Sequence, residues 1–352
     1  MRKMVFVSIL IAVAAALRLL TVADWDPTAF TAFGDEAVEI TQYAEAKLGR
    51  EVKTRILQGH DGKFFFVQAN DPLILDPAEN AAVLDRPIYR SQRMLYPLLA
   101  GGAGLFSPEV IVWALILINV AGLVVGSWAV GAIAVKHGLS AWWGLAFLFN
   151  VGLLSELYID GAGIVAFALA CLGALALEKE RPGWAAAAFA GAALTREVML
   201  LFVGSVALVW MIRKKSVPWL VAVPAGLAAL TWAAYLRIQI SATPGVDQVR
   251  EITFVPFSGL TGAVTSGMAT LSDFLVMGLF VLLTLVVLRR ARTSNVYLTW
   301  GAVGFAVLAP FLTIVVWQKS YDISRALAPL VTAFLIEFAL ARKREKAPVL
   351  VS

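Results

Sequence analysis

Cysteine and histidine are nearly absent from this sequence, which has one cysteine, Cys171, and two histidines among its 352 residues. A single cysteine forms no intrachain disulfide, so the chain is not a disulfide-stabilised secreted scaffold. Charge is also scarce. Only 15% of the residues are charged, whereas average soluble domains carry roughly a quarter. This shortage excludes an ordinary soluble domain, a coiled coil and an intrinsically disordered chain.

Hydrophobic residues make up 60% of the chain and gather in long runs that contain almost no charge. A helix needs about 20 apolar residues to cross a bilayer, because hydrocarbon offers no partner to unpaired backbone groups. Eight runs are predicted as full spans: residues 4–22, 110–135, 141–157, 161–177, 217–236, 273–288, 296–317 and 325–341. Two shorter or interrupted runs, residues 94–106 and 183–212, predict broken or re-entrant helices. The sequence therefore predicts an all-α polytopic integral membrane protein with a single transmembrane domain over residues 1–352.

Six short basic clusters indicate the orientation of these segments, because loops rich in lysine and arginine stay on the cytoplasmic side. The clusters are Arg2 with Lys3, Lys136 with His137, Lys179 with Arg181, residues 213–215, residues 289–292 and residues 342–346. Placing all six on one side puts both termini in the cytoplasm and the chain in the plasma membrane as a multi-pass protein. The net charge of +5 is then an orientation signal, so the lipid bilayer is the expected partner and nucleic acid is not.

With this orientation, residues 24–93 form a large extracytoplasmic loop that contains surface helices. Residues 35–48 are predicted as the first of these helices, with Gly49 as the stop signal. Its apolar face consists of four residues at helical spacing: Ala37, Ile40, Ala44 and Leu48. We expect this helix to lie on the membrane surface, with Tyr43 near the lipid headgroups.

Ionisable residues gather in the segments placed outside, where their cost at membrane depth favours a functional role. The candidate site residues are Asp35, Glu36, His60, Asp61, Lys63, Tyr89, Arg90, Arg93, Arg196, Glu197, Lys319, Asp322 and Arg325. A carboxylate can remove a proton from an acceptor hydroxyl, and arginines offer paired, permanently charged donors to phosphate. The aromatic residues 64–66, together with Tyr89, are expected to line a lipid-facing groove or to stack on a sugar. Together these residue types favour a substrate linked to a lipid phosphate.

A metal site built on histidine or cysteine is not predicted, since His60 and His137 are the only histidines and fall on opposite sides. Asp35, Glu36 and Asp61 could still supply hard oxygen ligands to a divalent cation such as Mg²⁺ or Mn²⁺. The sequence leaves open whether such a cofactor takes part.

An acidic pair just past the first span of a polytopic chain resembles the GT-C class of membrane glycosyltransferases, and among them bacterial mannosyltransferase-like members. The matching residues are Gly34, Asp35 and Glu36, residues 61–65 and residues 89–98, within the first hundred residues. The resemblance implies that a sugar passes from a polyprenyl-phosphate donor to a glycan, lipid or protein acceptor on the extracytoplasmic face, with inversion.

The same resemblance implies roles for individual residues. It makes Asp35 the catalytic base and Glu36 its neighbour or a metal ligand, with Asp61 as the rival base. It assigns the donor phosphate to four arginines: Arg90, Arg93, Arg196 and Arg325. 

Plainer interpretations compete with these roles. Asp35 could cap the predicted helix, and Asp61 could belong to a turn in which Gly62 supplies a positive φ. Glu156 and Asp160 are interpreted as interface residues rather than catalysts. Two other functions stay open: a transporter or lipid flippase, and a glycan ligase or polymerase that uses lipid-pyrophosphate donors.

Overall fold

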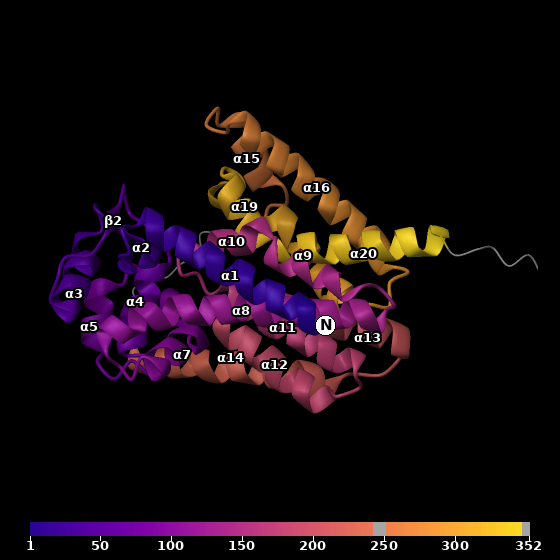
Figure 1. The fold of residues 1–352 in the computed structure, drawn as a ribbon, viewed down its shortest axis with the longest axis horizontal. Helices are drawn as coiled ribbons and strands as arrows, with labels where there is room; N and C mark the ends of the chain where they lie inside the picture. Colours follow the sequence, from indigo (N-terminus) through magenta and orange to yellow (C-terminus); the bar gives the residue numbers. More distant parts are fainter. Residues whose placement is uncertain (242–250, 347–352) are drawn as a thin grey trace, which may run out of the picture.

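The computed structural model of the protein describes residues 1–241 and 251–346. Helices dominate these ranges, as Figure 1 shows. The one sheet in them is a pair of two-residue parallel strands, β1 (Phe33–Gly34) and β2 (Thr54–Arg55). The all-α prediction is therefore confirmed for the part of the chain that the structure describes.

Four helices are long and apolar enough to cross a membrane. They are α1 (Arg2–Val22), α8 (Pro108–Lys136), α14 (Trp219–Gln239) and α16 (Leu271–Ala291). A fifth span results if α19 (Ser320–Ala326) and α20 (Ala328–Lys346) are taken together, although a bend of 68° separates them. The prediction of eight full spans is therefore wrong.

Two of the missing spans are apolar but interrupted. The run at residues 141–157 divides into η1 (Ala141–Gly144), α9 (Leu145–Leu148) and α10 (Val151–Leu157). Asn150 ends the first part and starts the next, because its side chain accepts a hydrogen bond from the backbone N–H of Gly152 at 3.1 Å. The run at residues 296–317 divides into α17 (Tyr297–Leu308), η2 (Ala309–Phe311) and α18 (Ile314–Trp317). It contains Pro310, which has no backbone N–H to continue a helix.

A third expected span is continuous but short. α11 (Gly163–Glu178) has 16 residues, fewer than the about 20 needed to cross a bilayer. It packs against α8 on one side and against α12 (Pro182–Thr195) on the other. Most of its residues are buried in protein, and hydropathy cannot distinguish such a core helix from a span.

The run at residues 183–212 forms the divided hairpin that the sequence predicts. Its two arms are α12 and α13 (Met199–Lys214). Pro182 and Arg213 lie at the ends of the arms that are farthest from the break, and both line the same cavity. Arg196 lies at the break between the arms and lines a different cavity.

Residues 24–93 fold into a compact helical segment that packs on α7 (Leu95–Ala103) and α8. Its helices are α2 (Thr28–Thr31), α3 (Val38–Leu48), α4 (Gly62–Asn70), α5 (Pro77–Val83) and α6 (Pro87–Ser91). The predicted helix at residues 35–48 is α3, which begins three residues later than expected and ends at Gly49, whose φ is +67°. Asp35 is therefore not its N-cap.

The expected placement of α3 on the membrane surface through its apolar face is wrong. Ile40 and Ala44, which lie on that face, are buried in a cluster with Phe33, Phe65 and Phe66. The helix contacts α4, α5 and α8. Protein, not lipid, covers its apolar side.

The basic clusters converge at one end of the molecule, which we call the basic end. Lys343 Nζ donates to the carbonyl of His137 at 3.3 Å, and Arg213 donates to the carbonyl of Ala291 at 2.6 Å. In Figure 1 the N-terminus, α13 and the end of α20 all lie in the right half of the molecule. The helices α3, α4 and α5 lie at the opposite end. The grouping of basic clusters follows the prediction.

Candidate functional site

Asp61 lies directly before α4, where the chain passes very close to two other segments. A Cβ on Gly62 would lie 2.4 Å from the carbonyl oxygen of Ile159 and 2.7 Å from that of Thr31. Glycine is required at position 62 by this close approach, not by a positive φ as the turn interpretation supposed. The contact fixes the position from which the Asp61 side chain extends.

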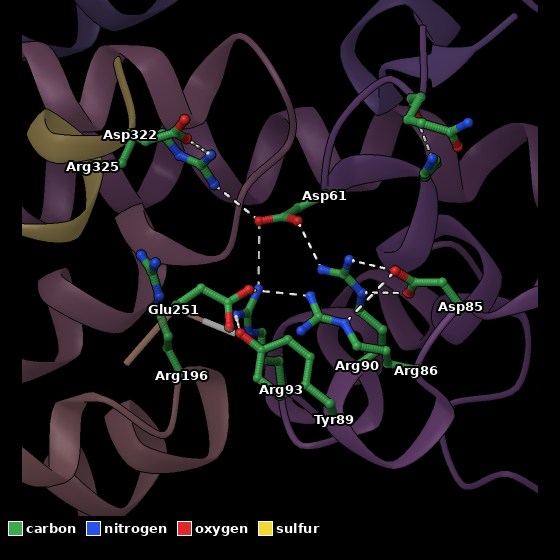
Figure 2. Close-up of polar contacts among 12 residues, drawn as sticks. Asp61, Asp85, Arg86, Tyr89, Arg90, Arg93, Arg196, Glu251, Asp322 and Arg325 are labelled. Atoms are coloured by element: carbon green, nitrogen blue, oxygen red, sulfur yellow. Dashed lines mark hydrogen bonds and ion pairs between the residues drawn. The ribbon is translucent and has the colours of Figure 1, made fainter. Parts of the chain in front are cut away.

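The Asp61 carboxylate is the centre of the site, and three arginines from two distant parts of the chain surround it (Figure 2). Its Oδ1 accepts from Arg90 Nη1 at 3.1 Å. Its Oδ2 accepts from Arg325 Nη2 at 3.0 Å and from Arg93 Nη1 at 3.5 Å. Burial by itself raises the pKa of Asp61, but the three guanidinium charges outweigh it and hold that pKa well below its usual range. Asp61 is therefore ionised.

Glu156 forms a second, deeper centre, with a side chain that is only 2% exposed. Its Oε1 accepts from Arg325 Nε at 2.9 Å and from Arg196 Nη1 at 3.3 Å. A Cβ on Gly161 would lie 1.7 Å from Glu156 Oε2, so a glycine there makes room for the carboxylate. The sequence predicts Glu156 to be an interface residue rather than a catalyst; the structure shows it buried, where it holds two of the site arginines.

The remaining carboxylates each hold an arginine at the edge of this cluster. Asp85 accepts two hydrogen bonds from Arg90, at 2.8 and 3.0 Å. The other pairs are Arg86 with Glu251 at 3.1 Å, Arg93 with Glu197 at 3.5 Å and Arg325 with Asp322 at 3.5 Å. Burial raises the pKa of Asp85, but the hydrogen bonds and charge of Arg90 lower it by a larger amount. The pKa therefore lies below its usual value, and this carboxyl is ionised too.

Two cavities meet at Asp61. The arginine cavity, of about 370 Å³, is lined by five arginines, Arg86, Arg90, Arg93, Arg196 and Arg325, and by four carboxylates, Asp61, Glu197, Glu251 and Asp322. Its other wall is apolar and is formed by Leu308, Leu312, Val315 and Val316. The acidic cavity, of about 510 Å³, is lined by Glu36, Glu39 and Asp85, among others. His60, Asp61 and Arg90 line both cavities.

The structure brings most of the predicted site residues to these cavities. Those that line one or both are Glu36, His60, Asp61, Lys63, Tyr89, Arg90, Arg93, Arg196, Glu197, Asp322 and Arg325. Asp35 and Lys319 are exposed and line neither cavity. Asp35 is adjacent to Glu36 in the chain, but its side chain is not part of the Asp61 cluster.

His60 and Lys63 flank Asp61 in sequence and lose part of their hydration. Burial and the charge of Arg325 lower the pKa of His60, which favours the neutral imidazole. Burial also lowers the pKa of Lys63, whose ammonium group donates to the carbonyl of Gln58. Lys63 is thereby held at the wall of the acidic cavity.

The aromatic residues have more varied positions than the sequence predicts. Phe65 and Phe66 are core residues, 2% and 0% exposed, so they cannot line a lipid-facing groove. Phe64 lies beneath Arg90: the guanidinium carbon of Arg90 is 3.9 Å from the centroid of the Phe64 ring. The Tyr89 hydroxyl accepts from Arg93 at 3.1 Å. Phe64 and Tyr89 thus help to position the arginines.

The three carboxylates suggested as ligands of a divalent cation do not converge. The Asp61 oxygens are engaged by guanidinium groups, and Asp35 lies outside both cavities. Across residues 1–241 and 251–346, no three His, Cys, Asp or Glu side chains are grouped in a way that could hold a metal ion.

Four residues of the cluster were absent from the predicted set: Asp85, Arg86, Glu156 and Glu251. Asp85 and Arg86 come just before the predicted Arg90, and their proximity to it in sequence is a signal that could have found them. The role of Glu156 could be predicted only if the break before α10 were known. Glu251 belongs to no motif, and only the fold brings it to Arg86.

Comparisons of the chain with protein-family models, with curated proteins and with solved structures find no match. The chemistry of the site must therefore be argued from its geometry. Guanidinium groups around a cavity bind anions, above all phosphate. An ionised carboxylate at the boundary between two cavities can accept a proton from a group in either one.

Proposed function

We propose that the protein is a membrane glycosyltransferase that takes a sugar from a polyprenyl-phosphate donor and passes it to an acceptor hydroxyl on the extracytoplasmic face. The observation that carries this proposal is the arginine cavity. Its five arginines suit a phosphate, while the apolar wall formed by Leu308, Leu312, Val315 and Val316 suits the first isoprene units beside it. A lipid phosphate combines both properties in one molecule.

Asp61 is the proposed base, because it lies between the donor and acceptor sides of the site. The acceptor hydroxyl would approach from the acidic cavity, and the sugar would extend toward Asp61 from the phosphate. A donor phosphate that shares Arg93 and Arg325 adds negative charge next to Asp61. Added negative charge raises the pKa of a carboxyl, so the bound donor makes Asp61 a stronger base than it is in the free protein.

The reaction is a single displacement. The acceptor oxygen attacks the anomeric carbon and forms the new glycosidic bond, while its proton passes to Asp61. The bond between the anomeric carbon and the phosphate oxygen breaks, and that oxygen keeps the electron pair. The arginines stabilise the polyprenyl phosphate that leaves. Attack from the face opposite the leaving group inverts the anomeric configuration.

The test compares Asp61→Asn with Asp35→Asn, because both replacements remove one carboxylate from the same segment. Membranes from cells that overproduce each protein are given radiolabelled polyprenyl-phosphate mannose or polyprenyl-phosphate glucose. We expect Asp61→Asn to lower sugar transfer about 100-fold or more, which is the usual contribution of a general base. Asp35→Asn should keep transfer close to that of the unchanged protein.

Two controls make the result decisive. Gel filtration shows whether Asp61→Asn folds, and binding of polyprenyl phosphate shows whether its arginines still accept an anion. Binding should persist, because removal of Asp61 leaves the arginines with one competing carboxylate fewer. Full transfer by a folded Asp61→Asn variant would refute Asp61 as the base. Failure of the unchanged protein to use any polyprenyl-phosphate sugar would refute the donor class.

A further inference from the structure

A groove on the surface of α8, α11 and α12 lies apart from the Asp61 site. It has a volume of about 410 Å³, and its walls are almost entirely apolar. The lining residues are Trp128, Leu169, Leu172, Leu175, Ala176, Lys179, Arg181, Trp184, Ala187 and Ala188. We call it the leucine groove. One end of the groove lies next to the basic end. Lys179 and Arg181 line the groove, and their sequence neighbours Glu180 and Pro182 line the cavity at the basic end.

The length of the leucine groove matches one leaflet of a bilayer. Leu169, Leu172, Leu175 and Lys179 follow at intervals of three or four residues, so they lie on one face of α11 and its end. At 1.5 Å per residue, the groove runs roughly 15 Å from Leu169 to Lys179. The hydrocarbon core of a bilayer is about 30 Å thick. An acyl chain of one leaflet can therefore lie along the leucines.

The charged end of the groove carries one sign only. Lys179 and Arg181 line it, and none of the described residues that line it is acidic. The neighbouring acids Glu178 and Glu180 line the separate cavity at the basic end instead. Positive charge in the leucine groove is therefore not neutralised by the groove itself.

Two tryptophans lie at the same end as the cations. Lys179 Nζ is 5.7 Å from the ring centroid of Trp128. Trp184 is 71% exposed, which is unusual for so large an apolar ring unless lipid covers it. Tryptophan is enriched at the level of the lipid headgroups. The leucines thus lead to an end where aromatic rings and cations lie together, which complements the acyl chain, the interfacial region and the phosphate of a phospholipid.

We propose that the leucine groove binds one phospholipid with a negatively charged headgroup. Its acyl chain lies along Leu169, Leu172 and Leu175, and its phosphate meets Lys179 and Arg181. Basic pockets between helices on the cytoplasmic side bind anionic lipid headgroups in this way. The proposal is independent of the glycosyltransferase proposal, because it involves no residue of the Asp61 site.

Native mass spectrometry of the purified full-length protein tests this site with two probes, phosphatidylglycerol and phosphatidylcholine of identical acyl chains. The groove variant is Lys179→Gln with Arg181→Gln. The matched control is Lys215→Gln with Arg344→Gln, which removes two exposed charges from the same end outside the groove. At the usual contribution of a cation to anionic lipid binding, the groove variant should lose about 10- to 30-fold in affinity for phosphatidylglycerol.

The control variant should bind phosphatidylglycerol within about 3-fold of the unchanged protein, since general surface charge contributes little to a specific site. A third variant, Ala187→Phe, fills the groove from its exposed side and should weaken the binding of both lipids. Gel filtration and melting temperature check that each variant folds. Equal affinity of the unchanged protein for the two lipids would overturn the proposal. An equal loss in the groove and control variants would also overturn it.

Discussion

Asp61 carries one negative charge, yet guanidinium groups of three arginines lie within 3.5 Å of its oxygens. The same arginines also reach Asp85 and Asp322 (Figure 2), as well as Glu156 and Glu197. Each charge is thus balanced by neighbours rather than by one partner. Such a network holds its members in fixed positions because removal of one leaves another buried and unpaired. A ligand phosphate can enter it by replacing a carboxylate as the partner of a guanidinium.

Replacement of Arg325 by methionine tests this dependence. Arg325 is 9% exposed and joins Asp61 to Glu156. Because its loss leaves Glu156 buried with less compensation, we expect Arg325→Met to destabilise the protein by about 3 kcal/mol. The melting temperature in detergent measures the effect. The double variant Arg325→Met with Glu156→Gln should recover part of the loss. A melting temperature unchanged by Arg325→Met would contradict the network.

Short helices, rather than the long apolar ones, carry most of the site. α4 follows Asp61, α6 carries Arg90 and α19 carries Arg325. α6 begins at Pro87, a residue whose fixed φ suits the first helical position. Breaks between elements therefore do as much as the helices to place the charged side chains, since each break turns the chain toward the same region.

Asn150, at the break between α9 and α10, connects this region to α20. Its Nδ2 donates to the carbonyl of Ala328 at 2.8 Å and to Thr332 Oγ1 at 3.1 Å. Its Oδ1 accepts from Gly152 N at 3.1 Å. Asn150 is fully buried, at 0% exposed, so its replacement leaves backbone groups without partners.

We expect Asn150→Leu to lower stability by about 1–3 kcal/mol, the cost of leaving buried polar groups unsatisfied. Thermal unfolding of the purified protein measures this loss. Ser155→Ala is the matched control, because it also removes a hydrogen bond, from Ser155 Oγ to the carbonyl of Val151 at 2.9 Å, but in an exposed position. It should change stability by less than about 0.5 kcal/mol. Equal melting temperatures for both variants would show that Asn150 does not stabilise the break.

Charge is sorted between the two ends of the molecule. Lysine and arginine without a surrounding cluster of acids gather at the basic end, whereas acids and arginines together form the Asp61 site. This separation supports an orientation in which the basic end faces the cytoplasm and the site faces outward. The four continuous candidate spans are compatible with it, because an even number of crossings returns both termini to the same side, although they are fewer than the sequence predicts.

Labelling with a membrane-impermeant maleimide tests the orientation. The chain is suited to this experiment because Cys171, its one cysteine, is 0% exposed. Glu39→Cys lies in the segment of α3, and Lys215→Cys lies at the basic end; both positions are exposed. In intact cells we expect labelling at position 39 only, and at position 215 only after permeabilisation. The reverse pattern would place the site in the cytoplasm.

The composition of the site was predictable from the sequence because scarce charges in an apolar chain must lie near its breaks. Arg90, Arg196 and Arg325 are far apart in sequence, yet each belongs to a polar segment between apolar runs. The partners of these residues were not predictable. Asp35 is exposed and lines neither cavity, whereas Asp61 lines both, and Glu251 reaches Arg86 only through the fold.

The fold was predictable in class but not in the number of spans. Hydropathy measures how apolar a segment is, and it responds equally to burial in lipid and burial in protein. α11 is apolar along its length, and α8, α12 and α17 pack against it, so most of its residues are buried. The interruptions at Asn150 and Pro310 are single residues within apolar runs, so they leave mean hydropathy almost unchanged while they divide the helix.

Binding of a lipid phosphate in the arginine cavity is tested by comparing polyprenyl phosphate with polyprenol of equal length. Native mass spectrometry gives both affinities for the unchanged protein, for Arg93→Gln and for the matched control Lys215→Gln. We expect the phosphate to bind at least about 10-fold more tightly than the alcohol, because it forms charge-assisted hydrogen bonds. Arg93→Gln should remove most of that difference, and Lys215→Gln should keep it. Equal binding of the phosphate and the alcohol would contradict the claim.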